Sequence, residues 1–309
     1  MSDPLRVFDR RRLRLHRDRA APTLSAHDFL LREVASRLAD RLHDVNRHFA
    51  SALDLGCHAG ETAQAIEASG AADTVIRCDL SYAMARRAGP PAVVADEEFL
   101  PFGTDAFDLA VSNLSLHWVN DLPGALLQLR QALRSDGLFL AAMLGDGTLA
   151  ELRECLMQAE IETADGVSPR VSPFAELRDI GGLLQRAGFS LPVADRDRIV
   201  VTYETVWKLF ADLRGMGESN TLAEQQRHFT GRRLFMRAAE IYQDRYADGA
   251  GRIPATFNVV YLHGWAPHAS QQRPLAPGSA KTRLANALES EEIPAGEPAM
   301  PTRRQDEEP

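Results

Sequence analysis

Acidic residues and glycines at particular spacings are the first chemically informative feature of the chain. The segment SALDLGCHAG, residues 51–60, is a short apolar run that ends in Asp54 and a turn containing Gly56 and Gly60. A helix-forming segment, ETAQAIEASG at 61–70, follows directly. Glycines let a backbone approach a ligand closely, and a helix N-terminus offers unpaired N–H groups. A strand, a glycine turn and a helix in this order predict a nucleotide-binding loop.

Further polar residues follow the next apolar segments. TVIRCDLS, residues 74–81, places Asp79 about 20 residues beyond the loop, the spacing of an acid that binds a ribose diol. That spacing fits NAD or S-adenosylmethionine. Asp96 ends the next such segment, and the stretch 112–118 ends the one after it. Parallel strands end at one edge of a sheet, so we expect one crevice there. Helix capping would explain one or two of these acids, but not the series.

Alternating apolar strands and helices between residues 51 and 143 predict βαβ units with right-handed crossovers. We expect an α/β, Rossmann-like doubly wound sheet that is mostly parallel and has an antiparallel final strand, IPATFNVVYLHGWAP. An arginine-rich helix precedes the sheet, and it is either solvated or closes over the crevice. We expect N-terminal helices over 1–50, a cofactor-binding core over 51–203, a helical lid over 204–250, a final strand and closure over 251–288, and a disordered tail over 289–309.

Composition sets the class of protein. The 309 residues are 45% hydrophobic and carry a formal charge of -8, which fits a globular protein and disfavours nucleic-acid binding. No apolar run approaches the roughly 20 residues of a membrane span. The cysteines Cys57, Cys78 and Cys155 lack metal-type spacing, so we expect no metal site. We therefore expect a cytoplasmic protein without an integral membrane segment.

Three longer strings identify a family. VVADEEFLPF, FDLAVSNLSLHWVNDLPGAL and LRSDGLFLAAM, together with the loop, resemble the class I (type 11) S-adenosylmethionine-dependent methyltransferases. The resemblance implies that Asp54 lies below the methionine part, that Asp79 binds the ribose and that Asp96 lies beside the adenine. It assigns S-adenosylmethionine binding to Asp54, Gly56, His58, Gly60, Asp79, Leu80, Asp96, Glu97 and Asn113.

One residue of the loop departs from the family pattern. The usual loop reads DxGxGxG, whereas His58 stands here at the middle glycine. A positive φ at this position would cost a non-glycine residue roughly 1 kcal/mol, which histidine tolerates better than most residues. We expect the cofactor site to survive.

The family layout also places residues near the reacting group. It puts Asn113 and His117 at the cofactor mouth as catalytic candidates, with Trp118 as a wall. His117 would accept a proton or hydrogen-bond a substrate carboxylate. The alternative, a structural histidine at a strand-to-helix turn, has equal support. We assign the substrate and lid region to Trp118, Tyr203, Arg214, Glu218 and Asn220.

A narrower resemblance concerns strings outside the cofactor site. FDRRRLRLHRDRAA, DLRGMGESN and PATFNVVYLHGWAPHASQQRPLAPGSA are similar to the subgroup that contains the mitochondrial complex I assembly factor and its bacterial relatives, over residues 7–285. This implies hydroxylation of an arginine in a quinone-site subunit of NADH dehydrogenase. The malonyl-carrier-protein methyltransferases of biotin synthesis are similar in outline. Hydroxylation would need an oxygen-activating metal or flavin, and the sequence contains no convincing site for either.

The resemblance leaves the acceptor open. We favour an S-adenosylmethionine-dependent methyltransferase-fold enzyme linked to complex I assembly, whose partner is a complex I subunit at the inner membrane. The alternatives are a protein arginine hydroxylase, a carboxyl methyltransferase of a small or carrier-bound acid, and a non-catalytic scaffold. Lid arginines would hold a carboxylate in bidentate fashion, whereas acids at the mouth would hold an arginine. The arginines are Arg214, Arg232 and Arg233, and the acids are Glu97, Glu98, Asp121, Asp212 and Glu218.

Overall fold

The structure is a computed structural model, and it describes residues 6–163, 166–224, 230–272, 279, 281–291 and 296. The chain divides into two compact units, Met1–Ala269 and Ser270–Pro309. The described part of the second unit contains one short helix, α10 (Leu284–Ala287). Most of the tail expected to be disordered, 289–309, lies outside the described residues, so that expectation stays a prediction.

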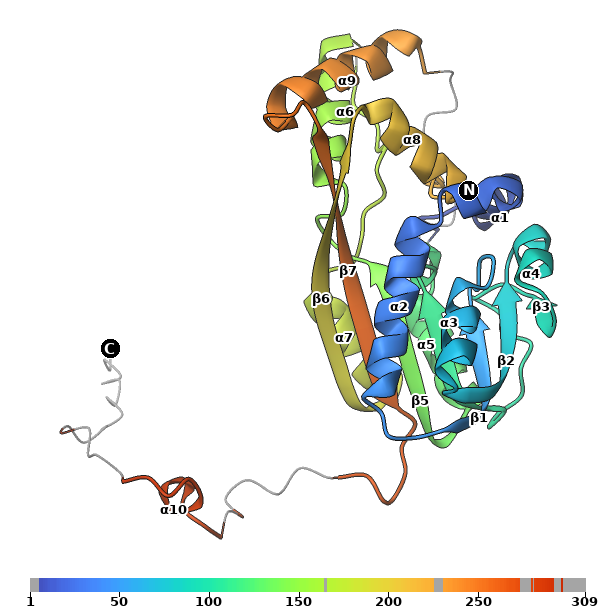
Figure 1. Ribbon diagram of the computed structural model, residues 1–309, viewed down its shortest axis with the longest axis vertical. Helices are drawn as coiled ribbons and strands as arrows, with labels where there is room; N and C mark the ends of the chain where they lie inside the picture. The colour runs from blue at the N-terminus through green and yellow to red at the C-terminus, as the bar shows by residue number, and fades with distance from the viewer. Residues whose placement is uncertain are drawn as a thin grey trace, which may run out of the picture. The chain divides into compact units, whose positions relative to one another are not determined.

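A seven-stranded sheet forms the centre of the first unit (Figure 1). Its strand order is β3-β2-β1-β4-β5-β7-β6. The first five strands in that order are parallel, and β7 runs antiparallel to both β5 and β6. The predicted doubly wound, mostly parallel sheet with an antiparallel final strand is confirmed. The strands are β1 (Phe49–Leu55), β2 (Ala72–Asp79), β3 (Ala92–Val94), β4 (Phe107–Asn113), β5 (Leu133–Leu144), β6 (Ser190–Tyr203) and β7 (Ile253–Trp265).

Helices cover both faces of the sheet. In Figure 1, α2 and α3 lie in front of it, and α5 and α7 lie behind it. The predicted apolar face of α2 is buried, because Leu30, Val34, Leu38 and Leu42 recur every fourth residue. These helices are α2 (Phe29–His43), α3 (Glu61–Ser69), α5 (Leu122–Ala132) and α7 (Leu177–Arg186), and a short helix α4 (Tyr82–Ala88) joins β2 to β3.

The long antiparallel strands β6 and β7 extend beyond the shorter parallel strands, and three helices gather at that end (Figure 1). These helices are α6 (Ala150–Thr163), α8 (Val206–Gly215) and α9 (Arg232–Tyr246). Helix α6 packs against α9 and β7, and α8 packs against β6 and α9. The helices α8 and α9 therefore fall in the segment 204–250 that the sequence assigns to a lid.

The N-terminal segment lies across the carboxyl ends of the parallel strands. Helix α1 (Arg10–Ala20) continues into the 3-10 helix η1 (Ala21–Ala26), and both pack against α4 (Figure 1). The segment is fixed in place by a hydrogen bond from the N–H of Asp9 to the carbonyl of Thr221 and by a bridge between Phe8 and Leu222. Helix α1 thus closes the edge of the sheet at which ligands of such folds bind.

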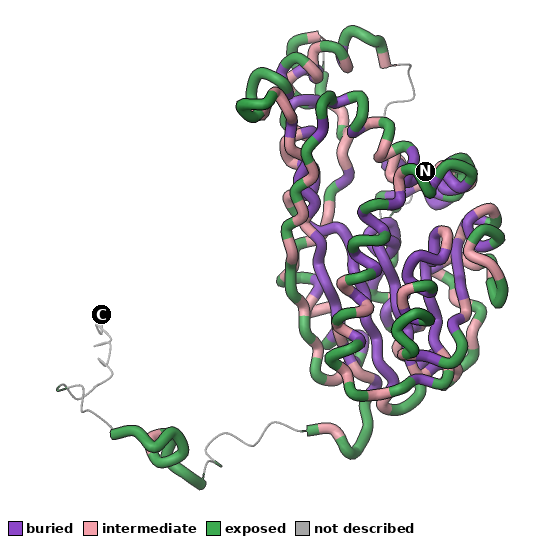
Figure 2. The backbone as a smooth tube through the Cα atoms, in the orientation of Figure 1, coloured by how far each residue is buried: buried purple, intermediate pink, exposed green. Residues whose placement is uncertain are grey.

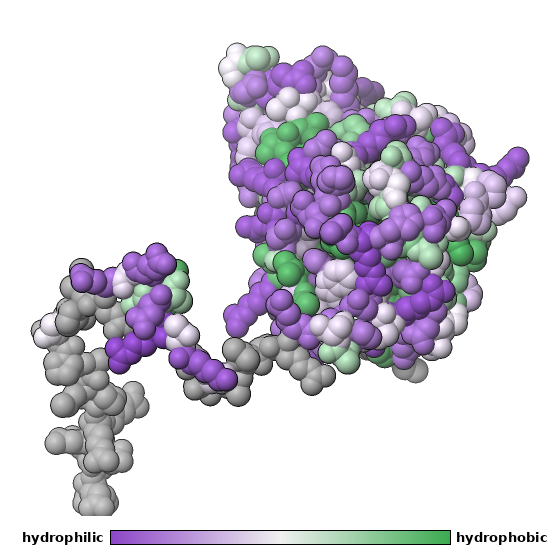
Figure 3. Space-filling model, turned by 60° about the horizontal axis from the view of Figure 1, so that its bottom comes forward, coloured by the Kyte–Doolittle hydropathy of each residue, from purple (hydrophilic) through white to green (hydrophobic). Residues whose placement is uncertain are grey.

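Burial follows this layering. The sheet is buried along most of its length and the outer helix faces are exposed (Figure 2). The face of the molecule in Figure 3 is mostly hydrophilic, with small and separate hydrophobic patches. Among the described residues, every helix is too short or too polar to cross a bilayer.

Candidate functional site

The loop between β1 and α3 is the first part of the site. Gly56 and Gly60 take φ values of 69° and 92°, which glycine adopts without a Cβ clash. A Cβ at Gly56 would stand 2.1 Å from the Oγ of Ser115, so this position also needs glycine for space. His58 has a φ of 48°, where a non-glycine residue costs roughly 1–2 kcal/mol. Its buried ring places Nε2 3.2 Å from the carbonyl oxygen of Asn113.

Asp79 ends β2 and is completely buried. Its carboxylate accepts the backbone N–H groups of His58 at 3.1 Å and Ser81 at 2.7 Å. It also accepts the guanidinium of Arg17, from α1, at 3.2 Å. The next residue, Leu80, packs beside the small apolar cluster that contains Trp118. The predicted ribose-binding acid therefore stands at the strand end, with an arginine already paired to it.

Glu97 lies at the centre of a second charged group. It accepts hydrogen bonds from Arg17 at 3.0 Å and from the Oγ of Ser115 at 2.7 Å, and it also pairs with Arg10. Arg10 donates to Asp96 at 2.6 Å as well. Burial alone would raise the pKa of Glu97, but Arg10 and Arg17 outweigh burial and lower this pKa to about 2. The two arginines of α1 thus neutralise the acids predicted to face the cofactor.

Asp54 is the penultimate residue of β1, below the loop, where it is completely buried. One carboxylate oxygen accepts the N–H of Ala63 at 3.1 Å. Burial, assisted by Glu61, raises the pKa of Asp54 to about 8. At neutral pH the side chain is therefore largely protonated and neutral.

The raised pKa of Asp54 predicts a pH-dependent stability. The folded protein holds this proton more tightly than the unfolded chain, whose Asp54 has the ordinary pKa of 3.8. The resulting stabilisation is complete below that pH and is lost as the pH rises toward 8. Asp54→Asn mimics the protonated acid, so it should flatten the fall in free energy of unfolding between pH 5 and pH 8. Urea unfolding across this range measures both slopes, and equal slopes would contradict the assignment.

His117 lies in the turn after β4, with both ring nitrogens engaged. Its Nδ1 accepts the N–H of Leu144 at 3.4 Å, which places the ring proton on Nε2. Nε2 lies 3.3 Å from the carboxylate of Glu218 and donates to it. Of the two roles left open by the sequence, the geometry therefore favours a structural one, in which His117 holds Glu218.

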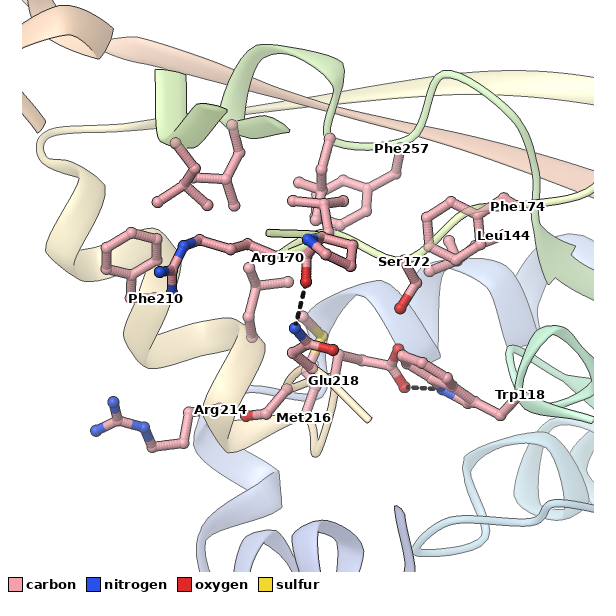
Figure 4. A pocket seen from close by; sticks show the side chains of 18 of the residues that line it. Trp118, Leu144, Arg170, Ser172, Phe174, Phe210, Arg214, Met216, Glu218 and Phe257 are labelled. Carbon is pink, nitrogen blue, oxygen red and sulfur yellow. Dashed lines mark hydrogen bonds between the residues drawn. The ribbon is translucent and has the colours of Figure 1, made fainter. Parts of the chain in front are cut away.

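Glu218 is positioned by the C-terminus of α8. The N–H of Gly217 bonds to the carbonyl of Arg214 at 3.1 Å, and the N–H of Glu218 bonds to that of Leu213 at 2.8 Å. This is a Schellman motif, which needs the positive φ of 85° at Gly217. The string RGMGES therefore ends the helix and turns the Glu218 carboxylate inward, where the indole N–H of Trp118 donates to it at 3.1 Å (Figure 4).

Glu218 borders a cavity of about 320 Å³ (Figure 4). Half of the lining residues are leucines and phenylalanines, and these come from α2, α6, α8, α9, β5, β7 and the loops between elements. Burial would raise the pKa of Glu218, but the hydrogen bond and electrostatic interaction with His117, together with the hydrogen bond from Trp118, outweigh burial and lower this pKa below its usual value. The carboxylate is therefore ionised. The polar lining residues are Ser168, Arg170, Ser172, Arg214, Glu218, Ser219, Asn220 and Thr230.

The two arginines of the cavity are poorly placed to neutralise Glu218. Arg170 donates to Glu160 at 2.7 Å and to Thr230 at 3.1 Å. In Figure 4 its guanidinium extends toward Phe210, and Arg214 extends away from Glu218. Glu218 is thus an ionised carboxylate on a largely apolar wall, and it accepts hydrogen bonds from His117 and Trp118.

The sequence-assigned residues fall into two neighbouring groups. The cofactor residues gather at the strand ends, with Gly60 against Ala88. Trp118, Arg214, Glu218 and Asn220 line the cavity. Tyr203 is not among the lining residues, because it is buried at the end of β6 near Asp212. Asn113 lies between the groups, and its Nδ2 donates to the carbonyl of Leu31 at 2.9 Å.

Three residues of the strand-end site escaped the sequence analysis: Arg10, Arg17 and Ser115. The arginine-rich helix left two interpretations open, and in the structure it lies over the strand ends, with Arg10 and Arg17 paired to the acids there. A signal existed, because Arg10, Leu13 and Arg17 are spaced by three and four residues and share the buried face of α1.

The strand ends carry buried polar atoms that fit a polar ligand. Within the described residues, Asp54 Oδ1, His58 Nδ1, Asn113 Oδ1 and Arg17 Nε have no hydrogen-bond partner. Buried polar groups are normally paired, so these atoms suit a ligand that bonds to them. The described part of the chain contains no group of three or more His, Cys, Asp or Glu side chains that could hold a metal ion.

Known proteins match this architecture. A family model described as a methyltransferase domain matches residues 26–192, more than half of the chain. The chain belongs to the methyltransferase-domain family. The solved structure of the YcgJ protein from Bacillus subtilis has the same fold, with a TM-score of 0.52 at 15% identity over 75% of this methyltransferase-family chain and 98% of that chain.

Two kinds of curated relative are similar to this methyltransferase-family chain over most of its length. Mitochondrial arginine-hydroxylase NDUFAF5 of Danio rerio is 42% identical over 289 residues, which are 91% of this chain and 89% of that protein. Its human counterpart is 43% identical over 283 residues, 89% and 81% of the two chains. The malonyl-[acyl-carrier protein] O-methyltransferase of Laribacter hongkongensis is 35% identical over 286 residues, 87% and 94% of the two chains.

Proposed function

We propose that this methyltransferase-family chain binds S-adenosylmethionine at the strand ends and acts on an arginine side chain of a respiratory complex I subunit. When bound, S-adenosylmethionine supplies a sulfonium group with an electrophilic methyl. Asp79 would hold the ribose hydroxyls, the Gly56 turn would let the backbone approach, and Asp96 would lie beside the adenine. The unpaired atoms of Asp54, His58 and Asn113 support a polar ligand in this position.

The negative charge of Glu218 is the main observation that supports an arginine side chain as the acceptor. An ionised carboxylate on an apolar wall attracts a cation that enters the cavity, because the low dielectric strengthens their interaction. Trp118 and His117 use part of its acceptor capacity, and a carboxylate offers about four lone-pair positions. A guanidinium can therefore still donate two parallel N–H bonds to it.

A carboxylate acceptor, such as a malonyl group, fits this cavity less well. It would lie beside the negative charge of Glu218, and like charges at short range repel in a poorly solvated site. Arg170 is already paired with Glu160. The higher identity to the arginine hydroxylases, 42% against 35%, supports the same choice.

The complex I setting is tested in cells. Intact-mass spectrometry of the complex I quinone-site subunit, isolated with and without this gene, should show a gene-dependent mass increase that peptide sequencing places on an arginine. A gain of one oxygen identifies hydroxylation, and a gain of one methyl identifies methyl transfer. An identical mass in both strains would contradict the proposed acceptor.

A further inference from the structure

Arg17 occupies an unusual position for an arginine. Its side chain is 1% exposed, and it reaches from α1 to Asp79 at the carboxyl end of β2. One guanidinium nitrogen donates to Asp79 and Glu97, and another donates to the Oγ of Ser115 at 2.8 Å. Ser115 and Glu97 are also the side chains that a Cβ at Gly56 would meet. The guanidinium therefore lies where the proposed cofactor approaches the glycine loop.

A ribose diol and Arg17 would compete for the same carboxylate. The diol is neutral and donates to Asp79, so its binding removes one anionic partner from Arg17. A buried guanidinium that loses an anion is strongly destabilising unless another anion replaces it. The remaining anionic partner of Arg17 would be Glu97, whose charge is shared with Arg10. The crevice therefore needs a new negative charge when the diol binds.

The cofactor proposed above carries one negative group, the α-carboxylate of its methionine part. We propose that Arg17 is a cofactor-binding residue, whose guanidinium leaves Asp79 when the ribose binds and pairs with this carboxylate. The inference rests on the proposed function, because it presumes that cofactor. It adds a residue outside the glycine loop and the strand-end acids, on a helix that precedes the sheet.

Only the side chain needs to move in this exchange. The backbone beside Arg17 is packed closely, since a Cβ at Gly217 would lie 3.5 Å from the Cα of Arg17. The start of α1 is held by the hydrogen bond from Asp9 to Thr221. The arginine side chain has several rotatable bonds, and its Nε is unpaired within the described residues. It can reorient while α1 stays in place.

Two ligands that differ in the amino-acid part test the exchange. S-Adenosylhomocysteine carries the α-carboxylate, whereas 5′-methylthioadenosine keeps the nucleoside and lacks the amino-acid part. Titration calorimetry would measure both affinities for the wild type, for Arg17→Met and for Arg14→Met, an exposed arginine of the same helix. Arg17→Met should lower the affinity for S-adenosylhomocysteine by roughly 10- to 100-fold, because a charged hydrogen-bonded pair is lost. It should leave 5′-methylthioadenosine unchanged or bound more tightly, and Arg14→Met should change neither.

The other outcomes overturn the inference in distinct ways. If Arg17→Met weakened the binding of both ligands equally, the role of Arg17 would be purely structural. If Arg17→Met strengthened the binding of both ligands, Arg17 would only compete with the ribose for Asp79. A wild type that binds neither ligand would overturn the proposed cofactor together with the inference. Arg17→Lys guards against a folding defect, because it keeps a positive charge beside Asp79 and Glu97. It should retain more of the preference for S-adenosylhomocysteine than Arg17→Met, and an equal loss would count against the pairing.

Discussion

Asp79→Asn should reduce S-adenosylmethionine affinity by roughly 10- to 150-fold and abolish the gene-dependent modification of the complex I subunit. The substitution keeps the shape of the side chain but removes its charge. A hydrogen bond from a hydroxyl to an ionised acceptor is worth about 1.5–3 kcal/mol, which corresponds to this range of affinity. The N–H groups of His58 and Ser81 bond to different carboxylate oxygens, so asparagine keeps an acceptor for one of them and loses the other. Calorimetric titration with S-adenosylmethionine measures the affinity.

Asp73→Asn is the matched control for Asp79→Asn. Asp73 lies at the other end of the same strand, 64% exposed and paired with His48 at 2.8 Å. It should leave cofactor affinity within about twofold, as expected of a surface ion pair of low energy. If Asp79→Asn reduced the cofactor affinity no more than Asp73→Asn does, the assignment of the cofactor site to the strand ends would be wrong. If cells expressing Asp79→Asn kept full modification without cofactor binding, the protein would act as a scaffold.

Glu218→Gln should reduce affinity for an arginine-containing acceptor peptide by roughly 30- to 5,000-fold while leaving cofactor affinity nearly unchanged. Truncating one partner of a buried, hydrogen-bonded charge pair costs about 2–5 kcal/mol. Glutamine keeps an oxygen for the indole N–H of Trp118, so the wall of the cavity should persist. The affinity is measured by titration with a peptide around the modified arginine.

Glu224→Gln is the control for Glu218→Gln, because Glu224 is exposed and lies outside the cavity lining. It should behave as the wild type. A negatively charged acceptor would give a different result from a positively charged arginine. If the acceptor were a carboxylate, removing the charge of Glu218 would strengthen its binding.

The central sheet and the acidic residues at its strand ends could be predicted from local sequence patterns. Short apolar segments that each end in a polar residue predict strand order only loosely, but they predict correctly that Asp54, Asp79 and Asp96 share one edge. The loop glycines follow from the same logic, since Gly56 needs both its φ and its missing Cβ. These features depend on residues close together in the sequence, which is why periodicity and turn chemistry suffice.

The closure of the site required tertiary information. Arg17 pairs with Asp79, 62 residues away, and Arg10 pairs with acids more than 80 residues away. An arginine on a helix is usually solvated, so its type alone does not indicate burial. The role of Glu218 likewise depends on the distant donors His117 and Trp118. Tyr203, which the sequence assigns to the substrate and lid region, is buried at the end of β6 and does not line the cavity.

A comparison of two peptides that differ by one side chain decides whether Glu218 binds a guanidinium. One carries the modified arginine of the complex I subunit, and the other carries citrulline, which has nearly the same shape without the charge. Titration of both into the wild type with S-adenosylhomocysteine present should give binding of the arginine peptide alone, and Glu218→Gln should abolish that preference. Equal affinity for both peptides would contradict a carboxylate site for a guanidinium at Glu218.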